Sequence, residues 1–220
     1  MKSNYAIWSE RHRPNTLDEC VLEALSPSQE AFVRALQKGS RLPNLLFYGS
    51  PGTGKTTVAR ILCASKRYCV HQFNGSLIGK SDVAEELQKY ALSGAMLFSE
   101  QRVMLIDEID GITEQGQMAL RALMEDPRVT TAWVLTCNLR KKLIEPLRSR
   151  LIEIDFNCPT LEHRQRHFKG ILRRCGQVLA AEGINDIPDD QLRDMIELDY
   201  PDLRKIITSL QMKFGYRHAA

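Results

Sequence analysis

The eight residues from Gly49 to Thr56 constrain the fold more than any other part of the sequence. Their sequence, Gly-Ser-Pro-Gly-Thr-Gly-Lys-Thr, matches the pattern G-x-x-x-x-G-K-S/T at every fixed position. An apolar run at 45–48 precedes them, and a run compatible with a helix follows at 57–62. A strand, a glycine-rich loop and a helix in this order predict a loop that binds a polyphosphate through its backbone N–H groups. The alternative is a glycine turn without a ligand.

The residues of this loop have distinct expected roles. Glycines let the backbone turn its N–H groups inward, and the start of the following helix adds positive potential. We expect Lys55 to reach the outer phosphates and to take part in catalysis, and the hydroxyl of Thr56 to bind Mg²⁺. The residues expected to bind the nucleotide in this stretch are Gly49, Ser50, Pro51, Gly52, Thr53, Gly54, Lys55, Thr56 and Thr57.

Apolar runs alternate with helical patterns over residues 1–158. The expected strands are 45–48, 68–73, 103–106, 132–136 and 151–156, and the expected helices are 56–64, 81–92 and 114–124. This alternation predicts an α/β fold with a parallel sheet of five strands and helices on both faces. Ligands of such sheets bind at the carboxyl ends of the strands, which is where the loop at 49–56 is expected.

The pattern changes after Cys158. Three helices are expected at 161–179, 189–198 and 202–216, and each begins beside a residue typical of helix starts. We therefore predict an α/β nucleotide-binding domain at 1–158 and a small three-helix lid domain at 159–220. The first lid helix is rich in basic residues, for which a solvated helix face is the favoured interpretation. These residues are His163, Arg164, Arg166, His167, Lys169, Arg173 and Arg174.

Two carboxylates, Asp107 and Glu108, follow the apolar strand expected at 103–106. The strand would deliver both to its carboxyl end, beside the phosphate-binding loop. Asp107 is expected to hold Mg²⁺, through water, and Glu108 to polarise the attacking water. An apolar run that ends in Asp-Glu is common by itself, so this interpretation depends on the loop nearby.

Three further polar residues are candidates for the same site. Asn138 follows the strand expected at 132–136 and would orient the water, although an Asn after a strand is usually a turn residue. Arg150 suits recognition of a phosphate, most simply on the nucleotide of a neighbouring subunit. Arg204 opens the last helix and would contact the γ-phosphate. A solvated surface position is the alternative for both arginines.

Composition limits the other classes of function. The chain has 220 residues, 43% of them hydrophobic and 26% charged, as in ordinary globular proteins. Its formal charge of +3 neither indicates nor excludes a nucleic-acid partner. It has no apolar run of membrane-spanning length, and its first residues lack the apolar core of a signal peptide. The six cysteines form no C-x-x-C pair, so we expect reduced thiols, as in a cytosol.

The order of these motifs is similar to that of the AAA+ ATPases, and more narrowly the chain resembles the ATPase subunits of sliding-clamp loaders. The likeness covers residues 8–216 and is nearest to the large loader subunit of tailed phages. Besides the loop and Asp107-Glu108, several segments follow one another in the order of the loader motifs. These segments are Trp8-Ser9-Glu10-Arg11-His12-Arg13-Pro14, Phe73-Asn74-Gly75-Ser76, Ala119-Leu120-Arg121 with Met124-Glu125, Pro146-Leu147-Arg148-Ser149-Arg150 and Pro201-Asp202-Leu203-Arg204.

The resemblance implies a DNA-replication ATPase that uses ATP and Mg²⁺ and is stimulated by DNA and clamp. It places the opening segment from Trp8, with Arg13, along the adenine, Arg150 as a finger on the neighbour's nucleotide and Arg204 as a sensor. The implied partners are a sliding clamp, primer–template DNA and other loader subunits in a pentameric spiral, with no membrane. The implied location is the cytoplasm of a prokaryotic or phage-infected cell, or the nucleus. DNA contacts are implied at Lys80 and Ser81, and clamp contacts at Met96, Leu97 and Phe98.

The sequence also departs from the loader pattern. Leu151 stands where loaders usually have a cysteine after Ser-Arg, the zinc module of bacterial-type subunits is missing, and we expect no collar domain after the lid. A protein- or nucleic-acid-remodelling motor is the second hypothesis, but residues 75–80 lack the aromatic side chain expected in its pore loop. A third hypothesis is a nucleotide-gated binding subunit with little hydrolysis. The presence of Lys55, Asp107 and Glu108 argues against it.

Overall fold

The computed structural model describes residues 7–39, 41–64, 68–76, 83–92 and 101–215. Its centre is a sheet of five parallel strands in the order β2-β3-β4-β1-β5. The strands are β1 (Leu45–Tyr48), β2 (Tyr68–Asn74), β3 (Gln101–Asp107), β4 (Ala132–Cys137) and β5 (Ile152–Asp155). All five expected strands are present, within two residues at either end, and the predicted α/β class is confirmed.

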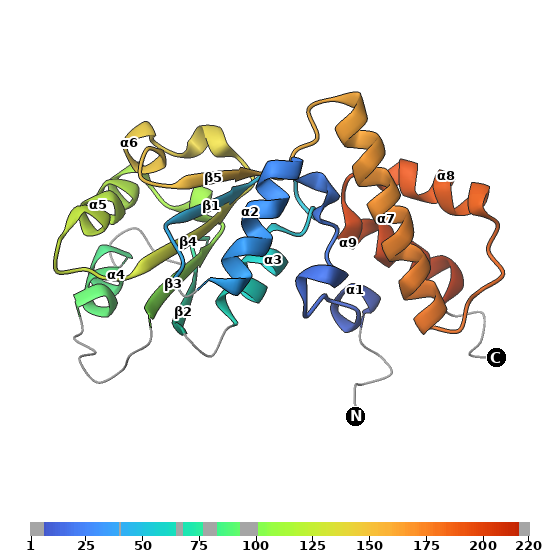
Figure 1. Ribbon diagram of the computed structural model, residues 1–220, viewed down its shortest axis with the longest axis horizontal. Helices are drawn as coiled ribbons and strands as arrows, with labels where there is room; N and C mark the ends of the chain where they lie inside the picture. The colour runs from blue at the N-terminus through green and yellow to red at the C-terminus, as the bar shows by residue number, and fades with distance from the viewer. Residues whose placement is uncertain (1–6, 40, 65–67, 77–82, 93–100, 216–220) are drawn as a thin grey trace.

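Alternation along the strands sorts apolar side chains onto the two faces of the sheet. Leu45 and Phe47 pack on the face covered by α2 (Pro27–Lys38) and α3 (Lys55–Cys63). Leu46, between them, packs on the opposite face with residues of α4 (Val83–Leu92), α5 (Glu114–Glu125) and α6 (Glu145–Arg148). Successive side chains of a strand point to opposite faces, so one apolar run supplies both cores. The three layers are visible in Figure 1.

The last part of the chain forms α7 (Leu161–Ala181), α8 (Asp189–Asp199) and α9 (Leu203–Phe214), beside the sheet layers (Figure 1). These helices enclose a separate apolar core. Side chains cap the N-termini of α7 and α9. The Thr160 hydroxyl accepts a hydrogen bond from the His163 backbone N–H at 3.2 Å, and the Asp202 carboxylate accepts one from the Lys205 backbone N–H at 3.0 Å. The three predicted helices are therefore present, and we refer to α7–α9 as the lid. The division into domains at residue 158 remains a prediction.

The N-terminal segment packs against the lid rather than against the sheet. Trp8, in α1 (Trp8–Arg11), is buried in the apolar core of the lid, and its backbone N–H donates to the side-chain oxygen of Gln211 at 2.8 Å. Arg11 and His12 both bind Glu182, just past the end of α7, at 2.8 Å and 2.5 Å. Residues 8–12 are therefore fixed to the lid at three points, an arrangement that the sequence did not predict.

Helix α2 was also missed, although the sequence carries a signal for it. Ser26 caps the helix by accepting from the Gln29 N–H at 3.2 Å, and Pro27 occupies its first turn. Val33 and Leu36, three residues apart, are buried against the sheet. Two short 3₁₀ turns, Leu17–Glu19 and Leu22–Ala24, lead into this helix.

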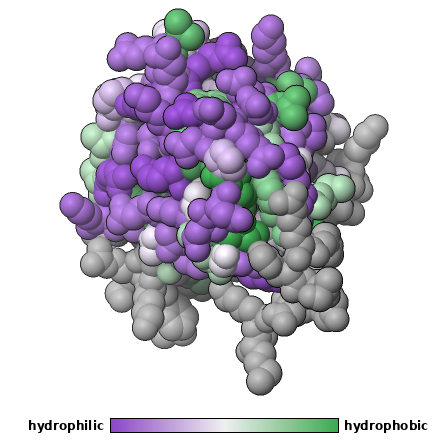
Figure 2. Space-filling view, turned by 90° about the vertical axis from the view of Figure 1, so that its right-hand side faces the viewer, coloured by the Kyte–Doolittle hydropathy of each residue, from purple (hydrophilic) through white to green (hydrophobic). Residues whose placement is uncertain are grey.

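The exposed face of the lid is mostly hydrophilic, with apolar side chains scattered among polar ones (Figure 2). Leu161, Leu198 and Met212 are the largely exposed apolar residues of the lid helices. Among the described residues, no helix combines the length and hydropathy needed to cross a membrane. All six cysteines are free thiols, as expected.

Candidate functional site

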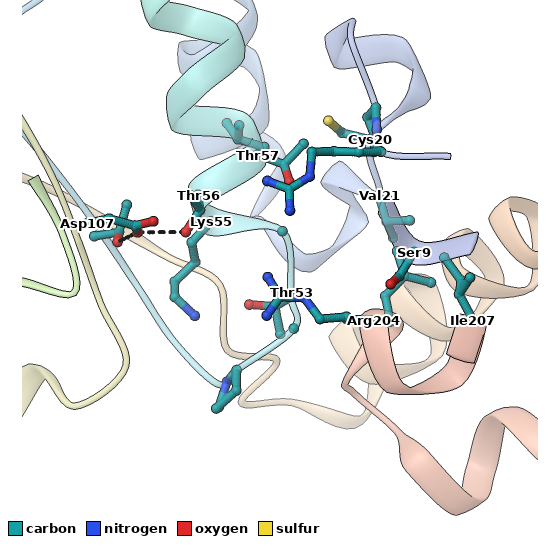
Figure 3. Close-up of a pocket in the computed structure, with 18 of the residues that line it drawn as sticks. Ser9, Cys20, Val21, Thr53, Lys55, Thr56, Thr57, Asp107, Arg204 and Ile207 are labelled. Atoms are coloured by element: carbon teal, nitrogen blue, oxygen red, sulfur yellow. Dashed lines mark hydrogen bonds between the residues drawn. The ribbon is translucent and has the colours of Figure 1, made fainter. Parts of the chain in front are cut away.

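A pocket lies where the phosphate-binding loop, the carboxyl ends of β3 and β4, the N-terminal segment and the lid meet (Figure 3). Its lining divides into two parts, which we call the phosphate end and the nucleoside end. The phosphate end is formed by Pro51, Gly52, Thr53, Gly54, Lys55, Thr56, Asp107, Glu108, Thr136 and Asn138. The nucleoside end is formed by Ser9, His12, Arg13, Pro14, Cys20, Val21, Arg174 and Ile207. Leu203 and Arg204 of the lid also line the pocket.

Glycines give the loop its shape at two positions. Gly54 has φ of 95° and immediately precedes α3, in a backbone conformation that L residues with side chains rarely adopt. Gly52 has φ of 71°, and a Cβ there would lie 1.8 Å from Oδ1 of Asp202 in the lid. The Leu203 N–H donates to the Gly52 carbonyl at 3.2 Å. The start of α9 is therefore in direct contact with the loop.

Lys55 is buried, and its ammonium group is bound to its own loop. The Nζ donates to the carbonyl oxygens of Gly49 at 2.8 Å and Ser50 at 2.7 Å. Burial lowers the pKa of Lys55 to about 8, because removal from water disfavours the charged form. The carboxylates of Asp107 and Asp202 act in the opposite direction. A triphosphate on this loop would offer the ammonium stronger acceptors than the two carbonyls.

The expected metal ligands lie side by side. The Thr56 hydroxyl donates to Oδ1 of Asp107 at 2.7 Å, as drawn in Figure 3, and the Thr136 hydroxyl donates to the same oxygen. The Arg60 guanidinium is 4.0 Å from Oδ2 of Asp107. Hydroxyl and carboxylate oxygens suit Mg²⁺, which typically takes one or two protein carboxylates together with substrate phosphates and water. Thr136 was not singled out from the sequence.

Glu108 projects from a strained turn at the end of β3. It is the single described residue other than glycine with positive φ, at 55°. Its N–H donates to the Thr136 hydroxyl at 3.2 Å, and its carboxylate accepts from the Ser76 hydroxyl. The turn after β2 is packed tightly here, because the Gly75 N–H donates to the Asp107 carbonyl at 2.7 Å. The loader-like segment at 73–76 therefore holds the side chain of the expected general base.

Asn138 lies at the end of β4 and lines the pocket, as expected. Its backbone N–H donates to Oδ2 of Asp110 at 3.3 Å, and that of Leu139 donates to the same oxygen at 2.9 Å. Asp110, which the sequence did not indicate, therefore fixes the turn that carries Asn138.

The three candidate arginines occupy different places. Arg204 lines the pocket and extends from α9 toward the loop near Thr53 (Figure 3). Arg13 lines the nucleoside end and pairs with Glu10 at 2.7 Å. Arg150 is not part of the pocket. It binds the Glu125 carboxylate, and its Nη1 donates to the Pro146 carbonyl at 2.6 Å.

The basic lid helix differs from the expected solvated face. His167 is 1% exposed and Arg174 is 8% exposed, while Arg166 donates to the backbone carbonyls of Glu23 and Leu25. Part of the helix therefore packs inward, so the solvated interpretation was wrong for these residues. The residues predicted to contact DNA and clamp lie outside the described residues: Lys80, Ser81, Met96, Leu97 and Phe98.

The chain is similar to known proteins over most of its length. The chain is 33% identical to replication factor C small subunit 2 of Pyrobaculum islandicum and 34% identical to the sliding-clamp-loader large subunit of Enterobacteria phage T4. These matches cover 94% and 93% of this chain and 63% of each relative, so the chain spans less than two thirds of their length.

A solved structure of the Holliday-junction branch migration motor RuvB from Thermotoga maritima shares the fold with a TM-score of 0.53 at 21% identity. That match covers 91% of this chain and 72% of the RuvB chain. Residues 45–159, which contain the sheet and the phosphate end of the pocket, match the family model described as "ATPase family associated with various cellular activities (AAA)". The chain therefore belongs to the AAA family of ATPases.

Proposed function

We propose that this chain is the ATP-hydrolysing part of a sliding-clamp-loader subunit. The observation that carries the proposal is the pocket, in which Lys55, the pair Thr56 and Asp107, and Glu108 lie together at the carboxyl ends of the strands. The similarity to a replication factor C small subunit and to a phage sliding-clamp-loader large subunit supports the loader role. In this role, ATP binding lets the assembled subunits hold an open clamp and primer–template DNA, and hydrolysis releases both.

Hydrolysis requires each residue at the phosphate end to exchange its present partner. Lys55 would leave the carbonyls of Gly49 and Ser50 for the phosphate oxygens. Thr56 and Asp107 would hold Mg²⁺, which when bound neutralises charge on the phosphates. Glu108 would leave the Ser76 hydroxyl and take up a proton from the attacking water, which Asn138 would orient. Arg204 would contact the γ-phosphate from the lid.

Arg150 acts in this proposal on the nucleotide of a neighbouring subunit. Its position outside its own pocket and its partly exposed side chain support that role. Glu125 holds the guanidinium in the isolated chain, so a γ-phosphate of the neighbour would compete with this carboxylate. A guanidinium supplied in trans accelerates phosphoryl transfer about 10³- to 10⁵-fold.

The partners of the proposed assembly are other loader subunits in a pentameric spiral, a sliding clamp and primer–template DNA. Contacts with DNA near Lys80 and Ser81, and with the clamp near Met96, Leu97 and Phe98, remain part of the proposal. The proposed location is the cytoplasm of a prokaryotic or phage-infected cell, or a nucleus.

The test is ATP hydrolysis by the assembled loader, with and without clamp and primer–template DNA. We expect stimulation when both are present, and loss of that stimulation in Arg150→Ala while ATP binding is retained. Arg128→Ala is the matched control, because Arg128 forms an exposed ion pair with Asp126 at 2.6 Å and lies outside the loader-like segments. Absence of stimulation in the unmodified complex would contradict the loader role, and loss of ATP binding in Arg150→Ala would contradict action in trans.

A further inference from the structure

Arg174 is a buried cation at the nucleoside end of the pocket. It lies on α7, is 8% exposed and lines the pocket beside His12 and Cys20. Its neighbour Arg173 has the opposite environment, with a side chain that is 52% exposed and an ion pair to Glu23 at 2.6 Å. Two adjacent arginines of one helix therefore differ in both burial and charge compensation.

The guanidinium of Arg174 has unused donor capacity. Its Nη2 donates to the His12 carbonyl at 2.5 Å and its Nη1 to the Gln177 side chain at 3.3 Å, while its buried Nε has no hydrogen-bond partner. Within the described ranges, Arg174 forms no ion pair. A guanidinium has five N–H donors, and burial of a cation without a carboxylate is costly unless other acceptors satisfy it. The Nε is too deeply buried to meet a ligand, but Nη1 and Nη2 each keep a second N–H, and Arg174 lines the pocket. The pocket wall therefore offers a position for a ligand that accepts hydrogen bonds.

The position of Arg174 identifies which part of a nucleotide it can reach. The loop and Lys55 define where the phosphates bind, at the start of α3. The remainder of a nucleotide must occupy the other end of the same pocket, where Arg174 lies. Pro14, Val21 and Ile207 line that end with apolar surface, which suits the faces of a flat ring.

We propose that Arg174 contacts the base, donating a hydrogen bond to a ring nitrogen of a bound purine. This inference rests on the proposed nucleotide binding and adds a specificity-determining residue to it. Purines carry acceptor nitrogens on the edges of the ring, whereas an apolar wall alone would not distinguish the base from other flat groups. The contact would satisfy a donor that the protein leaves unpaired.

The first experiment compares two ligands that share phosphates but differ in the nucleoside. ATP and inorganic tripolyphosphate are titrated into the full chain and into Arg174→Gln, with Mg²⁺ present. We expect ATP binding to weaken about tenfold or more and tripolyphosphate binding to remain unchanged. Arg173→Gln removes the same charge from the adjacent position and should change neither affinity. Equal weakening of both ligands, or of neither, would overturn the assignment.

The second experiment separates direct contact from support of the N-terminal segment through His12. We measure binding of 1-deaza-ATP, 3-deaza-ATP and 7-deaza-ATP, each of which lacks one ring acceptor, to the unmodified chain and to Arg174→Gln. A direct bond requires that one analogue binds more weakly than ATP to the unmodified chain and that this deficit disappears in the variant. Additive losses for all three analogues would refute the contact.

Arg174→Lys keeps the charge but not the planar fork, and provides a second variant if Arg174→Gln does not fold. We expect Arg174→Lys also to lose ATP affinity, and to bind ATP and the analogue identified with the unmodified chain equally well. If Arg174→Lys still binds that analogue more weakly than ATP, by as much as the unmodified chain does, the assignment is overturned. If the unmodified chain binds neither ATP nor tripolyphosphate, the proposed function itself fails. If it binds both and the variants behave like the unmodified chain, only the role of Arg174 is refuted.

Discussion

The two ends of the pocket differ in how completely the protein satisfies its own polar groups. At the phosphate end, Lys55, Asp107 and Glu108 each have protein partners before any ligand binds. At the nucleoside end, the Nε of Arg174 has none. A ligand at the phosphate end must replace existing bonds, so its net gain is smaller than its contacts suggest. A ligand at the nucleoside end would meet a guanidinium whose donors are only partly used by the protein.

This difference follows from how each end is built. The phosphate end comes from one loop and from the ends of adjacent parallel strands, which the sheet brings together. The nucleoside end comes from the N-terminal segment, from Cys20 and Val21 between the two 3₁₀ turns, and from the lid, which are joined by tertiary contacts alone. Substitutions at the two ends should therefore weaken the binding of different ligands, and by different amounts.

The largest effect is expected at Glu108. Glu108→Gln keeps the size of the side chain and removes the base, so hydrolysis should fall about 10²- to 10⁴-fold. ATP binding should remain, because Lys55 and the loop are unchanged. Single-turnover hydrolysis and equilibrium binding are the measurements. Near-normal turnover would show that Glu108 is not the base, and Asp110→Asn, at the turn beside Asn138, tests whether loss of charge alone accounts for the defect.

Lys55→Ala should weaken binding to the phosphate end by about 10- to 100-fold, because it removes a charge-assisted hydrogen bond. ATP and tripolyphosphate should lose affinity equally, in contrast to the variants of Arg174. Lys205→Ala, which removes an exposed lysine paired with Asp199, is the control and should change neither affinity. A loss confined to ATP would erase the distinction between the two ends.

The sequence predicted the phosphate end because its signals are local. The order of small and apolar residues determines the strand, the loop and the helix start, and a parallel sheet then places Asp107 and Glu108 beside the loop. The strands were predicted within two residues for the same reason. The roles of Thr136 and Ser76, whose hydroxyls bind the two carboxylates, were not predicted, because a hydroxyl at a strand end has no distinctive pattern.

At the nucleoside end only the opening segment with Arg13 was predicted, through the resemblance, and the lid side was not, because it depends on pairs of residues far apart in the chain. Arg174 lies among six other basic residues of its helix, and only the His12 carbonyl and the lid core distinguish it from them. The contact between Gly52 and Asp202 likewise joins residues 150 positions apart. Such packing is set by tertiary structure, and periodicity along one helix identifies the buried face only approximately.

The lid should also have a stability that depends on pH, independently of the phosphate end. Burial lowers the pKa of His167 to about 4, with a further contribution from His163, and its Nδ1 is 3.0 Å from the Tyr200 hydroxyl. The unfolded chain takes up this proton below its ordinary pKa near 6.5, whereas the folded lid does not. Stability is therefore lost as pH falls from 6.5 toward 4, by about 2 kcal/mol between pH 7 and 5. The free energy of unfolding is measured with urea at pH 7 and at pH 5, and His167→Gln should remove this part of its pH dependence. A pH dependence in the variant equal to that of the unmodified chain would contradict the role of His167.

The smallest effect is expected from Glu182→Gln, which tests whether the N-terminal segment belongs functionally to the lid. Glu182 accepts from Arg11 at 2.8 Å and from His12 at 2.5 Å, with side chains less than one fifth exposed. Loss of these bonds should loosen the wall of the nucleoside end and weaken ATP binding about fivefold, equivalent to about 1 kcal/mol. Tripolyphosphate binding should not change, since none of these residues contacts the loop. Glu197→Gln, on the exposed side of α8, is the matched control.

A double variant tests whether the segment and the lid act together. Because Arg174 also donates to His12, Glu182→Gln combined with Arg174→Gln should lose less ATP affinity than the sum of the two single effects. Fully additive losses would mean that the segment and the lid act on the nucleotide separately, although they are packed together.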